Sequence, residues 1–447
     1  MFTRTPEAHK PWAAPKVYAP WRATRACAAF LINYIQMEGV MGLNKKTVRD
    51  VELKGKRVVM RVDFNVPVKE GKIKDDTRIQ AALPTIKYVL DKGASLVLLS
   101  HLGRPDGEVK PEFSLKPTAD ALAKLLGKEV KFAPDCIGED IVAMAKALKP
   151  GEIMVCENTR FHKEEDMKAK TDEDKKKMQG FAAELAKLGD VFVNDAFGTA
   201  HRAHGSTALI CKFIPVSVAG FLMEKEIQYL GQTVENPKRP FVAIIGGAKI
   251  SGKLEVLTSL ISKCDAILIG GGMAYTFLKA QGHNIGKSLC EDELIDTAKQ
   301  VLAEAKSKNV TFLLPVDNLA ADKFDNAAQI KTVGNDIPEG WMALDVGPKT
   351  VAAYTAEIAK AKTIVWNGPM GCFEMPNFAK ATMAICKAVA DASDKGAISV
   401  IGGGDSVSAV NQSGLAGKMS HISTGGGASL EFLEGKKLPG VFALNDL

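Results

Sequence analysis

The sequence predicts an α/β fold of two doubly wound parallel-sheet domains, joined by a helix and a hinge. Three observations lead to this prediction. Short apolar runs typical of strands alternate with helix-period segments along most of the chain. A turn-rich segment at residues 235–240 interrupts the alternation, which then begins again. The length of 447 residues exceeds what one core usually supports and suits two domains of about 200 residues each.

Residues 1–40 differ from the rest and are expected to form an N-terminal extension. They carry five basic and two acidic residues, which gives a net charge of 5 − 2 = +3, together with four prolines. An acidic-poor, arginine-bearing leader is compatible with an organelle transit peptide. Met41 is equally compatible with the true start, which would make the leader non-native. A cytoplasmic location is the main expectation, and a mitochondrion, plastid or glycosome-like organelle is the alternative if the leader is genuine.

Residues 41–220 are expected to form the first domain. Strands alternating with helices give a parallel sheet covered on both faces. The strand-like runs are 57–64, 95–99, 129–132, 153–156 and 190–193, and the helix-period segments lie around 79–91, 114–126, 137–148 and 173–188. The mixed-charge segment 163–177 is expected to be a solvated loop and helix face.

An amphipathic helix is predicted over 221–234, and with the break at 235–240 it forms the expected linker, 221–240. The second domain, 241–430, repeats the alternation, and 431–447 remains as a C-terminal tail. Its strand-like runs are 241–245, 266–269, 311–314, 341–344, 363–366 and 397–401. Both sheets should present their sites at the carboxyl ends of the strands.

Composition limits the class of partner. The hydrophobic fraction is 46% and the charged fraction 25%, as in ordinary globular proteins. The net charge of +6 is spread along the chain, without the arginine-rich arm that favours nucleic acid. No apolar run reaches the roughly 18 residues of a membrane span. The eight cysteines include no C-x-x-C pair, which indicates reduced, mostly structural thiols. We expect small-molecule substrates, and neither a nucleic-acid nor a membrane partner.

The predicted strand ends of the first domain are unusually cationic. If the sheet is parallel, these side chains share one edge and form a basic surface suited to carboxylate and phosphate, which arginine grips with two hydrogen bonds. The polar and basic residues at these ends are Arg61, Asp63, Asn65, His101, Arg104, Arg160, His201, Arg202 and His204, with Arg78 at the start of a helix.

Glycine-rich turns follow four apolar runs of the second domain, at 246–247, 270–272, 402–404 and 425–427. Each precedes a helical segment, so each can direct backbone N–H groups at a phosphate. Four such turns indicate a nucleotide, although no G-x-G-x-x-G is present to indicate a dinucleotide. Asp405 is a candidate Mg²⁺ ligand, with a helix N-cap as the alternative. Glu374 is a candidate partner for ribose hydroxyls, or is merely exposed.

Lys249 and Lys253 open the helical pattern that follows the turn at 246–247. The spacing nearly matches the P-loop signature, but Leu254 stands where that signature needs Ser or Thr to hold magnesium. We therefore expect a phosphate-binding turn of another kind, with an ordinary strand-to-helix turn as the alternative.

No nucleophile or general base stands out in the sequence. Phosphoryl transfer does not require one, because positioning and charge neutralisation supply most of the rate enhancement. A carboxylate acceptor, with a pKa of roughly 4, needs no base at all.

From about Met41 to Leu447 the chain resembles the phosphoglycerate kinase family. The matching motifs run in family order, and they are RVDFN at 61–65, SHLGRP at 100–105, NDAFGTAHRAH at 194–204, GGAK at 246–249, WNGP at 366–369, GGGD at 402–405 and STGGG at 423–427.

The resemblance implies reversible transfer of the acyl phosphate of 1,3-bisphosphoglycerate to Mg-ADP, giving 3-phosphoglycerate and ATP, in a monomer whose two lobes close about a hinge. It places hinge contacts near the linker helix and His421. It assigns the glycerate ligand to Arg61, Asp63, Asn65, Arg78, His101, Arg104, Arg160 and Arg202. It assigns the nucleotide to Gly247, Lys249, Lys253, Gly271, Gly272, Asn367, Glu374, Gly403, Gly404, Asp405 and Ser406, with Mg²⁺ on Asp405. Groups flanking the transferred phosphoryl would be Arg78 and Lys249, assisted by the N–H groups around Gly404 and Gly427.

Three residues depart from the family pattern. Gly252 replaces a usual acidic residue between the two lysines, which puts the turnover rate in doubt. Thr159 replaces an apolar residue before Arg160, and Cys372 replaces an aliphatic residue near the nucleotide. Two other hypotheses remain: an inactive nucleotide-binding protein, which would bind ATP without transfer, and nucleic-acid binding through the basic surface, which would weaken steeply with salt.

Overall fold

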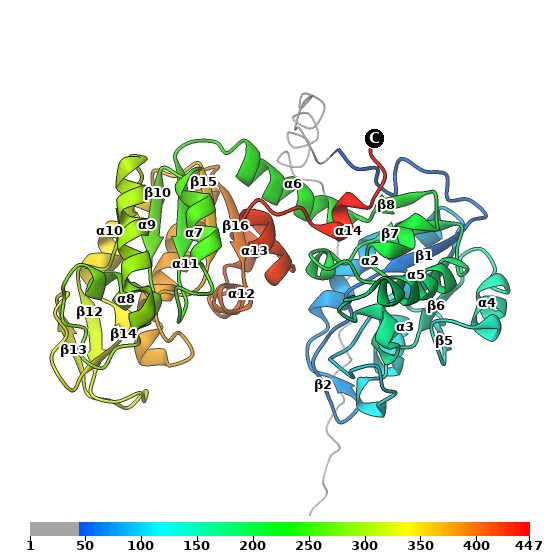
Figure 1. Ribbon diagram of the computed structural model, residues 1–447, viewed down its shortest axis with the longest axis horizontal. Helices are drawn as coiled ribbons and strands as arrows, with labels where there is room; N and C mark the ends of the chain where they lie inside the picture. The colour runs from blue at the N-terminus through cyan, green and yellow to red at the C-terminus, as the bar shows by residue number, and fades with distance from the viewer. Residues whose placement is uncertain (1–43) are drawn as a thin grey trace, which may run out of the picture. The chain divides into compact units, whose positions relative to one another are not determined.

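The computed structural model describes residues 44–447, so the expectations for residues 1–40 lie outside the described residues. The described residues contain two six-stranded parallel sheets covered by helices, which confirms the α/β fold with two doubly wound sheets (Figure 1). No helix among residues 44–447 combines the length and apolar character that crossing a membrane requires.

The first sheet has the strand order β5-β6-β4-β1-β7-β8, with every neighbouring pair parallel. Every residue of β4, β6 and β7 is buried, as expected for strands covered on both faces. The strands are β1 (Arg57–Arg61), β4 (Ser95–Leu99), β5 (Lys131–Ala133), β6 (Ile153–Cys156), β7 (Val191–Asn194) and β8 (Ser217–Ala219), and the helices are α2 (Thr77–Asp91), α3 (Lys116–Leu126), α4 (Glu139–Lys146) and α5 (Asp172–Ala186). A two-stranded hairpin, β2 (Val68–Lys69) and β3 (Lys72–Ile73), follows β1.

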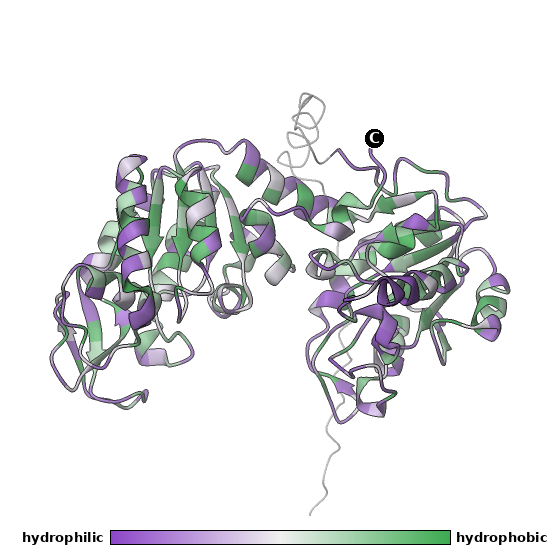
Figure 2. Cartoon of the chain, in the orientation of Figure 1, coloured by the Kyte–Doolittle hydropathy of each residue, from purple (hydrophilic) through white to green (hydrophobic). Residues whose placement is uncertain are grey.

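The second sheet has the order β11-β10-β9-β15-β16-β17, again all parallel. Figure 2 shows the apolar strands at the centre of each sheet and mixed polar and apolar helices around them. The strands are β9 (Phe241–Ile245), β10 (Ala266–Ile269), β11 (Thr311–Leu313), β15 (Thr363–Asn367), β16 (Ile398–Gly402) and β17 (His421–Ile422), and the helices are α7 (Leu254–Ile261), α8 (Met273–Ala280), α9 (Ile295–Ser307), α10 (Pro348–Ile358), α11 (Lys380–Asp394), α12 (Gly404–Gln412) and α13 (Gly427–Leu433).

The prediction that 341–344 belongs to the second parallel sheet is wrong. β14 (Met342–Val346) instead pairs antiparallel with β12 (Asn318–Ala321), which also pairs antiparallel with β13 (Ile330–Val333). A short apolar run has the same appearance in either kind of sheet, because only its pairing partners distinguish the two. This three-stranded sheet is an addition to the doubly wound pattern rather than part of it.

Helix α6 (Phe221–Glu235) leads from the last strand of the first sheet to the first strand of the second. Its buried residues include Met223, Ile227 and Leu230. The N-terminus is capped from outside the helix: Asp195 Oδ1 accepts from the backbone N–H groups of Leu222 at 2.8 Å and Met223 at 3.1 Å. This cap satisfies two of the amides that a helix start leaves free and fixes the helix to the loop after β7.

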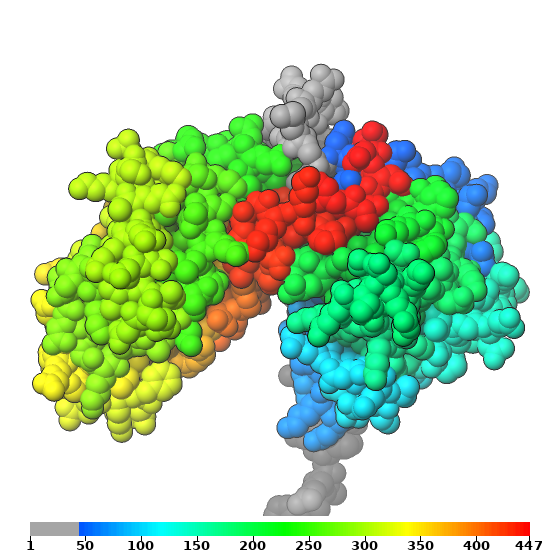
Figure 3. All heavy atoms as spheres, viewed as in Figure 1, coloured from blue at the N-terminus to red at the C-terminus, as the bar shows by residue number. Residues whose placement is uncertain are grey.

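The C-terminal residues, including α14 (Pro439–Phe442), contact the first sheet through the hydrogen bonds below, and Figure 3 shows them in red beside blue and green segments of the first half of the chain. Asn445 N–H donates to the Ser217 carbonyl at 2.8 Å, and its side-chain oxygen accepts from Ser217 N–H at 2.7 Å. Lys46 N–H donates to the Asn445 carbonyl at 2.9 Å. Gly440 N–H donates to the Ala200 carbonyl at 2.8 Å. The edge of the first sheet is therefore covered by both ends of the described chain.

The cysteines agree with the expected reduced, mostly structural thiols. All seven cysteines between residues 44 and 447 are free. Cys156 and Cys264 are buried, as their positions in or beside apolar runs predict. Burial raises the pKa of both thiols, which keeps them protonated and unreactive.

Candidate active site

A cavity of about 1070 Å³ opens at the carboxyl ends of the first sheet. Seven of the eight residues expected to bind the glycerate ligand line it. Six come from the four segments that follow β1, β4, β6 and β7, which end at one edge of the parallel sheet, and Arg78 comes from the first turn of α2. These residues are Asp63, Asn65, Arg78, His101, Arg104, Arg160 and Arg202, accompanied by His201 and His204. Thr424 and the glycines 425–427, from the turn after β17 of the second sheet, also line the cavity.

Arg61 does not line this cavity, although its position at the end of β1 predicted that it would. It is buried, and its Nε donates to Ser206 Oγ at 2.8 Å. Burial lowers the pKa of Arg61, and the buried carboxylate of Glu165 counteracts the effect. Glu165 accepts from Ser206 N–H at 2.8 Å, so the two charges share one partner. The buried Arg61 guanidinium, enclosed with the Glu165 carboxylate, therefore lies behind the wall of the cavity.

One charged residue is buried within segment 163–177, which is expected to be a solvated loop and helix face. Glu165 has no exposed surface, whereas most charged residues of α5 are exposed. Burial raises the pKa of this carboxyl group, and Arg61 opposes that shift. The alternating charges of this segment do not indicate that Glu165 is the buried member. The residues that interact with it, Arg61 and Ser206, lie about a hundred residues earlier and forty residues later in the chain.

His101 is held neutral in the cavity wall. Burial lowers its pKa well below the usual value, and the charge of Arg61 adds to this shift. Arg61 Nη2 lies 3.0 Å from His101 Nδ1. Because a guanidinium can only donate, Nδ1 accepts and the ring proton lies on Nε2. His101 is therefore a fixed N–H donor. His201 and His204 are also uncharged at neutral pH, since burial lowers their pKa values to about 4 and about 3.

Arg78 and Arg160 are each held by a carboxylate. Arg78 Nη1 donates to both oxygens of Asp63 at 3.0 Å and to the Asn65 carbonyl at 3.1 Å. Arg160 Nη1 donates to the Gly103 carbonyl at 2.9 Å. Its Nε lies 2.9 Å from Asp166, close enough for an ion pair but without hydrogen-bond geometry. Both guanidiniums thus retain N–H groups that can bind an anionic ligand.

The glycine turns of the second sheet pack their backbones together. Gly246 N–H donates to the Asn367 carbonyl at 3.0 Å, and a Cβ on Gly246 or on Gly368 would overlap backbone atoms of the other turn. Gly271 has φ +69°, and a Cβ there would lie 2.6 Å from the Gly247 carbonyl oxygen. Gly272 precedes α8 as its N-cap. The backbones of the turns after β9, β10 and β15 therefore pack directly against one another, and no side chain fits at these glycine positions.

Lys249 and Lys253 both precede helix α7, which begins at Leu254, rather than forming its first turn. Lys249 is exposed, whereas Lys253 is partly buried and donates to Asn367 Oδ1. Burial lowers the pKa of Lys253 to about 8, and the nearby charge of Asp405 opposes this shift. Gly252, between the two lysines, has no neighbouring atom where a side chain would be.

Asn367, Asp405 and Ser406 lie around the start of helix α12. Gly403 has φ +86° and precedes the helix, and a Cβ on it would lie 3.0 Å from Asn367 Nδ2. That Nδ2 atom is buried and lacks a hydrogen-bond partner. Ser406 Oγ accepts from Gly368 N–H at 2.5 Å, and Asp405 is exposed in the first helical turn. An unpaired donor beside a helix N-terminus is suited to an anion.

Glu374 and two of the residues that depart from the family pattern, Thr159 and Cys372, differ in their degree of burial. Glu374 is exposed, and its expected role is neither supported nor opposed by a contact. Thr159 is buried, and its hydroxyl donates to the Ser100 carbonyl at 3.2 Å, which explains how a polar residue fits there. Cys372 is partly buried, and burial raises its pKa to about 11, so its thiol stays protonated.

A buried polar cluster joins α6 to the last strand and turn of the second sheet, the region in which the family resemblance places hinge contacts. Glu226 Oε2 lies 2.7 Å from His421 Nε2, and its other oxygen accepts from Thr424 N–H at 2.7 Å. Tyr229 stacks on the His421 ring with centroids 4.9 Å apart. Helix α6 is thus linked to the turn whose glycines line the cationic cavity.

Comparisons with known proteins agree with this arrangement. A family model described as phosphoglycerate kinase matches residues 48–436. A phosphoglycerate kinase of Chloroherpeton thalassium is 56% identical over 405 residues, which cover 90% of this chain and 100% of that protein. One of Clostridium novyi is 54% identical over 409 residues, covering 91% and 100%. Among solved structures, phosphoglycerate kinase from Coxiella burnetii has a TM-score of 0.81 at 43% identity, covering 89% of this chain and 98% of that one. The one from Pyrococcus horikoshii has a TM-score of 0.73 at 33% identity, with the same coverage.

Proposed function

The chain belongs to the phosphoglycerate kinase family, and from this premise we propose how its own residues share the reaction. The family identity makes it a phosphotransferase of glycolysis that moves a phosphoryl group between 1,3-bisphosphoglycerate and a nucleotide. In the proposed division of the chain, residues 41–220 hold the glycerate ligand and 241–430 the nucleotide. Residues 221–240 connect them, and 431–447 return to the first of these segments.

The cationic cavity of the first sheet is the proposed glycerate site. Arg78 from the first turn of α2 and Arg104, Arg160 and Arg202 from separate segments after strands supply positive charge, and His101 supplies a fixed neutral donor. A ligand carrying a carboxylate and phosphate groups needs such separated cationic partners. Asp63 and Asn65 orient Arg78 and Gly103 rather than attracting the anion, because the carboxylate is already hydrogen-bonded to Arg78.

The glycine turns and Lys253 form the proposed site for ADP and ATP. The unpaired buried Nδ2 of Asn367, beside the start of α12, fits an incoming phosphate oxygen. Asp405 would hold the Mg²⁺ ion, because an exposed carboxylate beside the phosphates offers the oxygen ligand that magnesium prefers. When bound, this ion neutralises part of the charge on the nucleotide phosphates. Gly247, Gly271 and Gly272 keep side chains away from the nucleotide.

Transfer needs no general base, since the glycerate carboxylate is ionised at neutral pH and can attack or leave without proton exchange. Arg78 and Lys249 would bring positive charge to the two sides of the transferring phosphoryl group. The N–H groups around Gly404, at the start of α12, and Gly427, at the cavity, would stabilise its equatorial oxygens. Hinge closure about α6 and the Glu226–His421 pair would bring the two ligands together.

The observation that carries this proposal is the composition of the cavity wall. Arginines from the first sheet and glycines 425–427 from the second sheet line the same 1070 Å³ space, so one chamber contains groups for an anionic ligand and for a transferring phosphoryl. A monomer with small-molecule substrates is sufficient for this chemistry. We propose a cytoplasmic location, with an organelle as the alternative if residues 1–40 direct import.

The direct test is ATP formation from 1,3-bisphosphoglycerate, ADP and Mg²⁺ in a coupled assay. Correctly folded protein should turn over, and nucleotide binding without any transfer would contradict the proposal.

Lys249→Ala should lower kcat by about 10²- to 10³-fold while changing nucleotide Kd much less, because its charge acts mainly in the transition state. Lys360→Ala, which removes another exposed lysine, is the matched control. Equal losses in kcat and affinity would contradict the role given to Lys249.

A further inference from the structure

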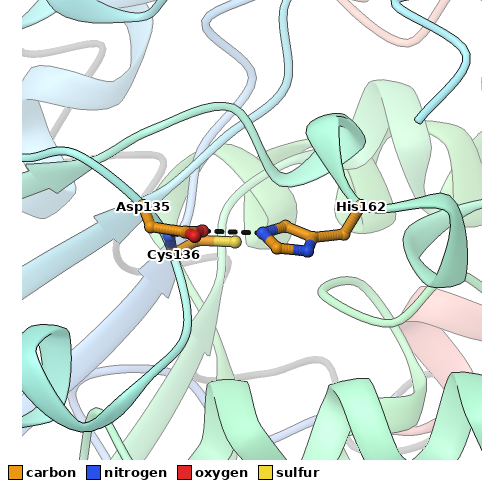
Figure 4. A group of neighbouring side chains, drawn as sticks. All are labelled: Asp135, Cys136 and His162. Carbon is orange, nitrogen blue, oxygen red and sulfur yellow. Dashed lines mark hydrogen bonds and ion pairs between the residues drawn. The ribbon is translucent and has the colours of Figure 1, made fainter. Parts of the chain in front are cut away.

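Asp135, Cys136 and His162 bring three potential metal-binding atoms together on the first sheet, outside the residues that line the cationic cavity. Asp135 and Cys136 follow β5, and His162 lies between the short helical turns η2 (Thr159–Phe161) and η3 (Lys163–Glu165). A carboxylate oxygen, the Cys136 sulfur and a ring nitrogen all lie within 4.8 Å of one another. Figure 4 shows the sulfur and the carboxylate side by side, both facing the same edge of the His162 ring.

The local backbone holds these groups in place. Asp135 Oδ1 lies 2.6 Å from His162 Nε2 and also accepts from Cys136 N–H at 2.6 Å. The Phe181 ring packs on His162 with centroids 5.3 Å apart, which limits rotation of the imidazole. A tetrahedral zinc ion with bonds of about 2.0–2.3 Å keeps its ligand atoms roughly 3.3–3.8 Å apart. The observed separations therefore need only small side-chain movements to reach this geometry.

The site can be reached from solvent. The Cys136 sulfur belongs to a fully buried residue, but the Asp135 side chain is 46% exposed and that of His162 is 24% exposed. An ion can thus enter from the Asp135 side and meet the thiol at the inner end. A water molecule from the solvent side would complete the tetrahedral set as the fourth ligand.

We propose that Asp135, Cys136 and His162 form a binding site for a divalent ion of the zinc class. One sulfur, one imidazole nitrogen and one carboxylate oxygen make a mixed donor set that favours Zn²⁺ and Co²⁺ over Mg²⁺, which prefers oxygen ligands alone. On binding, the thiol proton leaves to solvent and the ion replaces the contact between Asp135 and His162. The site is therefore separate in place and in chemistry from the magnesium site proposed at Asp405.

Occupancy would have a structural consequence for the neighbouring cavity. His162 lies two residues after Arg160, which lines the cavity and donates to Gly103. The ion would join the loop after β5 to the segment that carries Arg160, through three bonds stronger than the present ion pair. Hydrogen exchange of the amides of residues 159–165 should then slow when the metal is bound, which reports occupancy without reference to turnover.

The test is titration of the full-length chain with Co²⁺. Binding should produce the near-ultraviolet thiolate-to-cobalt absorption and the visible bands of four-coordinate cobalt. Cys136→Ser should abolish the thiolate band, and His162→Gln should weaken Co²⁺ binding at least tenfold. Cys290→Ser is the matched control, because Cys290 is partly exposed and lies 3.2 Å from Asp292, a thiol–carboxylate pair without a histidine. The control should retain the wild-type spectrum.

Two results would overturn the proposal. One is a thiolate band that persists in Cys136→Ser, and the other is wild-type protein with no thiolate band at saturating Co²⁺. If a substitution impairs folding, X-ray absorption of the zinc-loaded Cys290→Ser protein gives the answer. One sulfur neighbour with nitrogen and oxygen neighbours supports the site, and a shell without sulfur rejects it.

Discussion

Among single residues, Lys253 shows how burial changes the chemistry of a charged side chain. Its amino group donates to Asn367, but burial lowers its pKa to about 8 from an ordinary value near 10.5. The cationic form is therefore costly in the absence of an anion. Such a lysine is suited to binding a phosphate. A bound anion would stabilise the charged amino group, which burial destabilises in the free protein.

Replacing Lys253 by Met should change how stability depends on pH. Between pH 8 and about 10.5 the unfolded wild-type chain binds more protons at this position than the folded chain, so the free energy of unfolding rises with pH across this window. In Lys253→Met this rise should be absent, and near pH 7 the variant should be about 1–3 kcal/mol more stable. Urea unfolding at pH 7 and pH 10 measures both effects, with Lys360→Met as an exposed control. A variant with the wild-type pH profile would contradict the assignment.

Asp166 places a carboxylate in the wall of a site proposed for anions, 2.9 Å from Arg160 Nε. We predict that Asp166→Asn binds 3-phosphoglycerate about two- to fivefold more tightly, because a like charge is removed and Arg160 is freed. Calorimetric titration measures the change. Glu173→Gln, which changes an acidic residue of α5 that neither lines the cavity nor pairs with a residue that does, should have no effect. Weaker binding by Asp166→Asn would show that Asp166 instead holds Arg160 in its binding orientation.

The sequence predicted most cavity residues because strand ends of a parallel sheet converge on one edge. His101, Arg160 and Arg202 follow predicted strands and line the cavity, as does Arg78, which the sequence places at the start of a helix. Arg61 satisfied the same rule and is buried, because its environment depends on Glu165 and Ser206, whose positions the strand pattern does not determine. Residues such as Asp166 were missed for the related reason that a charge run does not reveal which members turn inward.

At the scale of elements, the turns after β9 and β15 illustrate why particular positions require glycine. Gly368 has φ +103°, a conformation that other residues rarely adopt, and a Cβ there would overlap the carbonyl group of Gly246. These two turns lie between the proposed nucleotide site and the core strands. Their close approach sets the surface on which a nucleotide would rest.

Gly368→Ala should therefore destabilise the chain by about 3 kcal/mol or more, because strained backbone and steric overlap add. Gly252→Ala is the matched control, since Gly252 has negative or extended φ and open space where a side chain would extend, and it should change stability by less than about 0.5 kcal/mol. Urea unfolding curves compare the two variants. Equal stability would mean that the turns separate without cost.

The lengths and burial of the strands explain which elements the sequence predicts. β4, β6, β9 and β10 were predicted with their observed bounds, because each is a continuous apolar run between turn residues. β8 and β17 have three and two residues, too few to show a period, and were missed. β14 was predicted as a strand but assigned to the wrong sheet, since pairing direction depends on residues distant in sequence.

At the scale of the whole molecule, the C-terminal segment completes the first sheet. Asn445 exchanges hydrogen bonds with Ser217 of β8 at 2.7 Å and 2.8 Å, and Leu444 is only 3% exposed. Lys45 Nζ donates to the Leu444 carbonyl at 2.9 Å. A sheet built from the first half of the chain thus depends on residues at its other end.

Deleting residues 443–447 should lower the melting temperature by about 5–10 °C, because a buried leucine and the backbone bonds to β8 are lost together. Differential scanning calorimetry measures the change. Asp446→Asn, which keeps the backbone and removes only an exposed charge paired with Lys45, should shift the temperature by no more than about 2 °C. An unchanged melting temperature after deletion would show that the tail contacts add little.

The same tail has a consequence for synthesis of the protein. Translation proceeds from the N-terminus, so the strands of the first sheet leave the ribosome long before residues 443–447 are made. Until residues 443–447 emerge, β8 lacks the Asn445 contacts that cover its edge. The first sheet of a nascent chain therefore has an open edge, able to pair with other strands, while the second half is being made, and the emergence of the tail permits the final folding step.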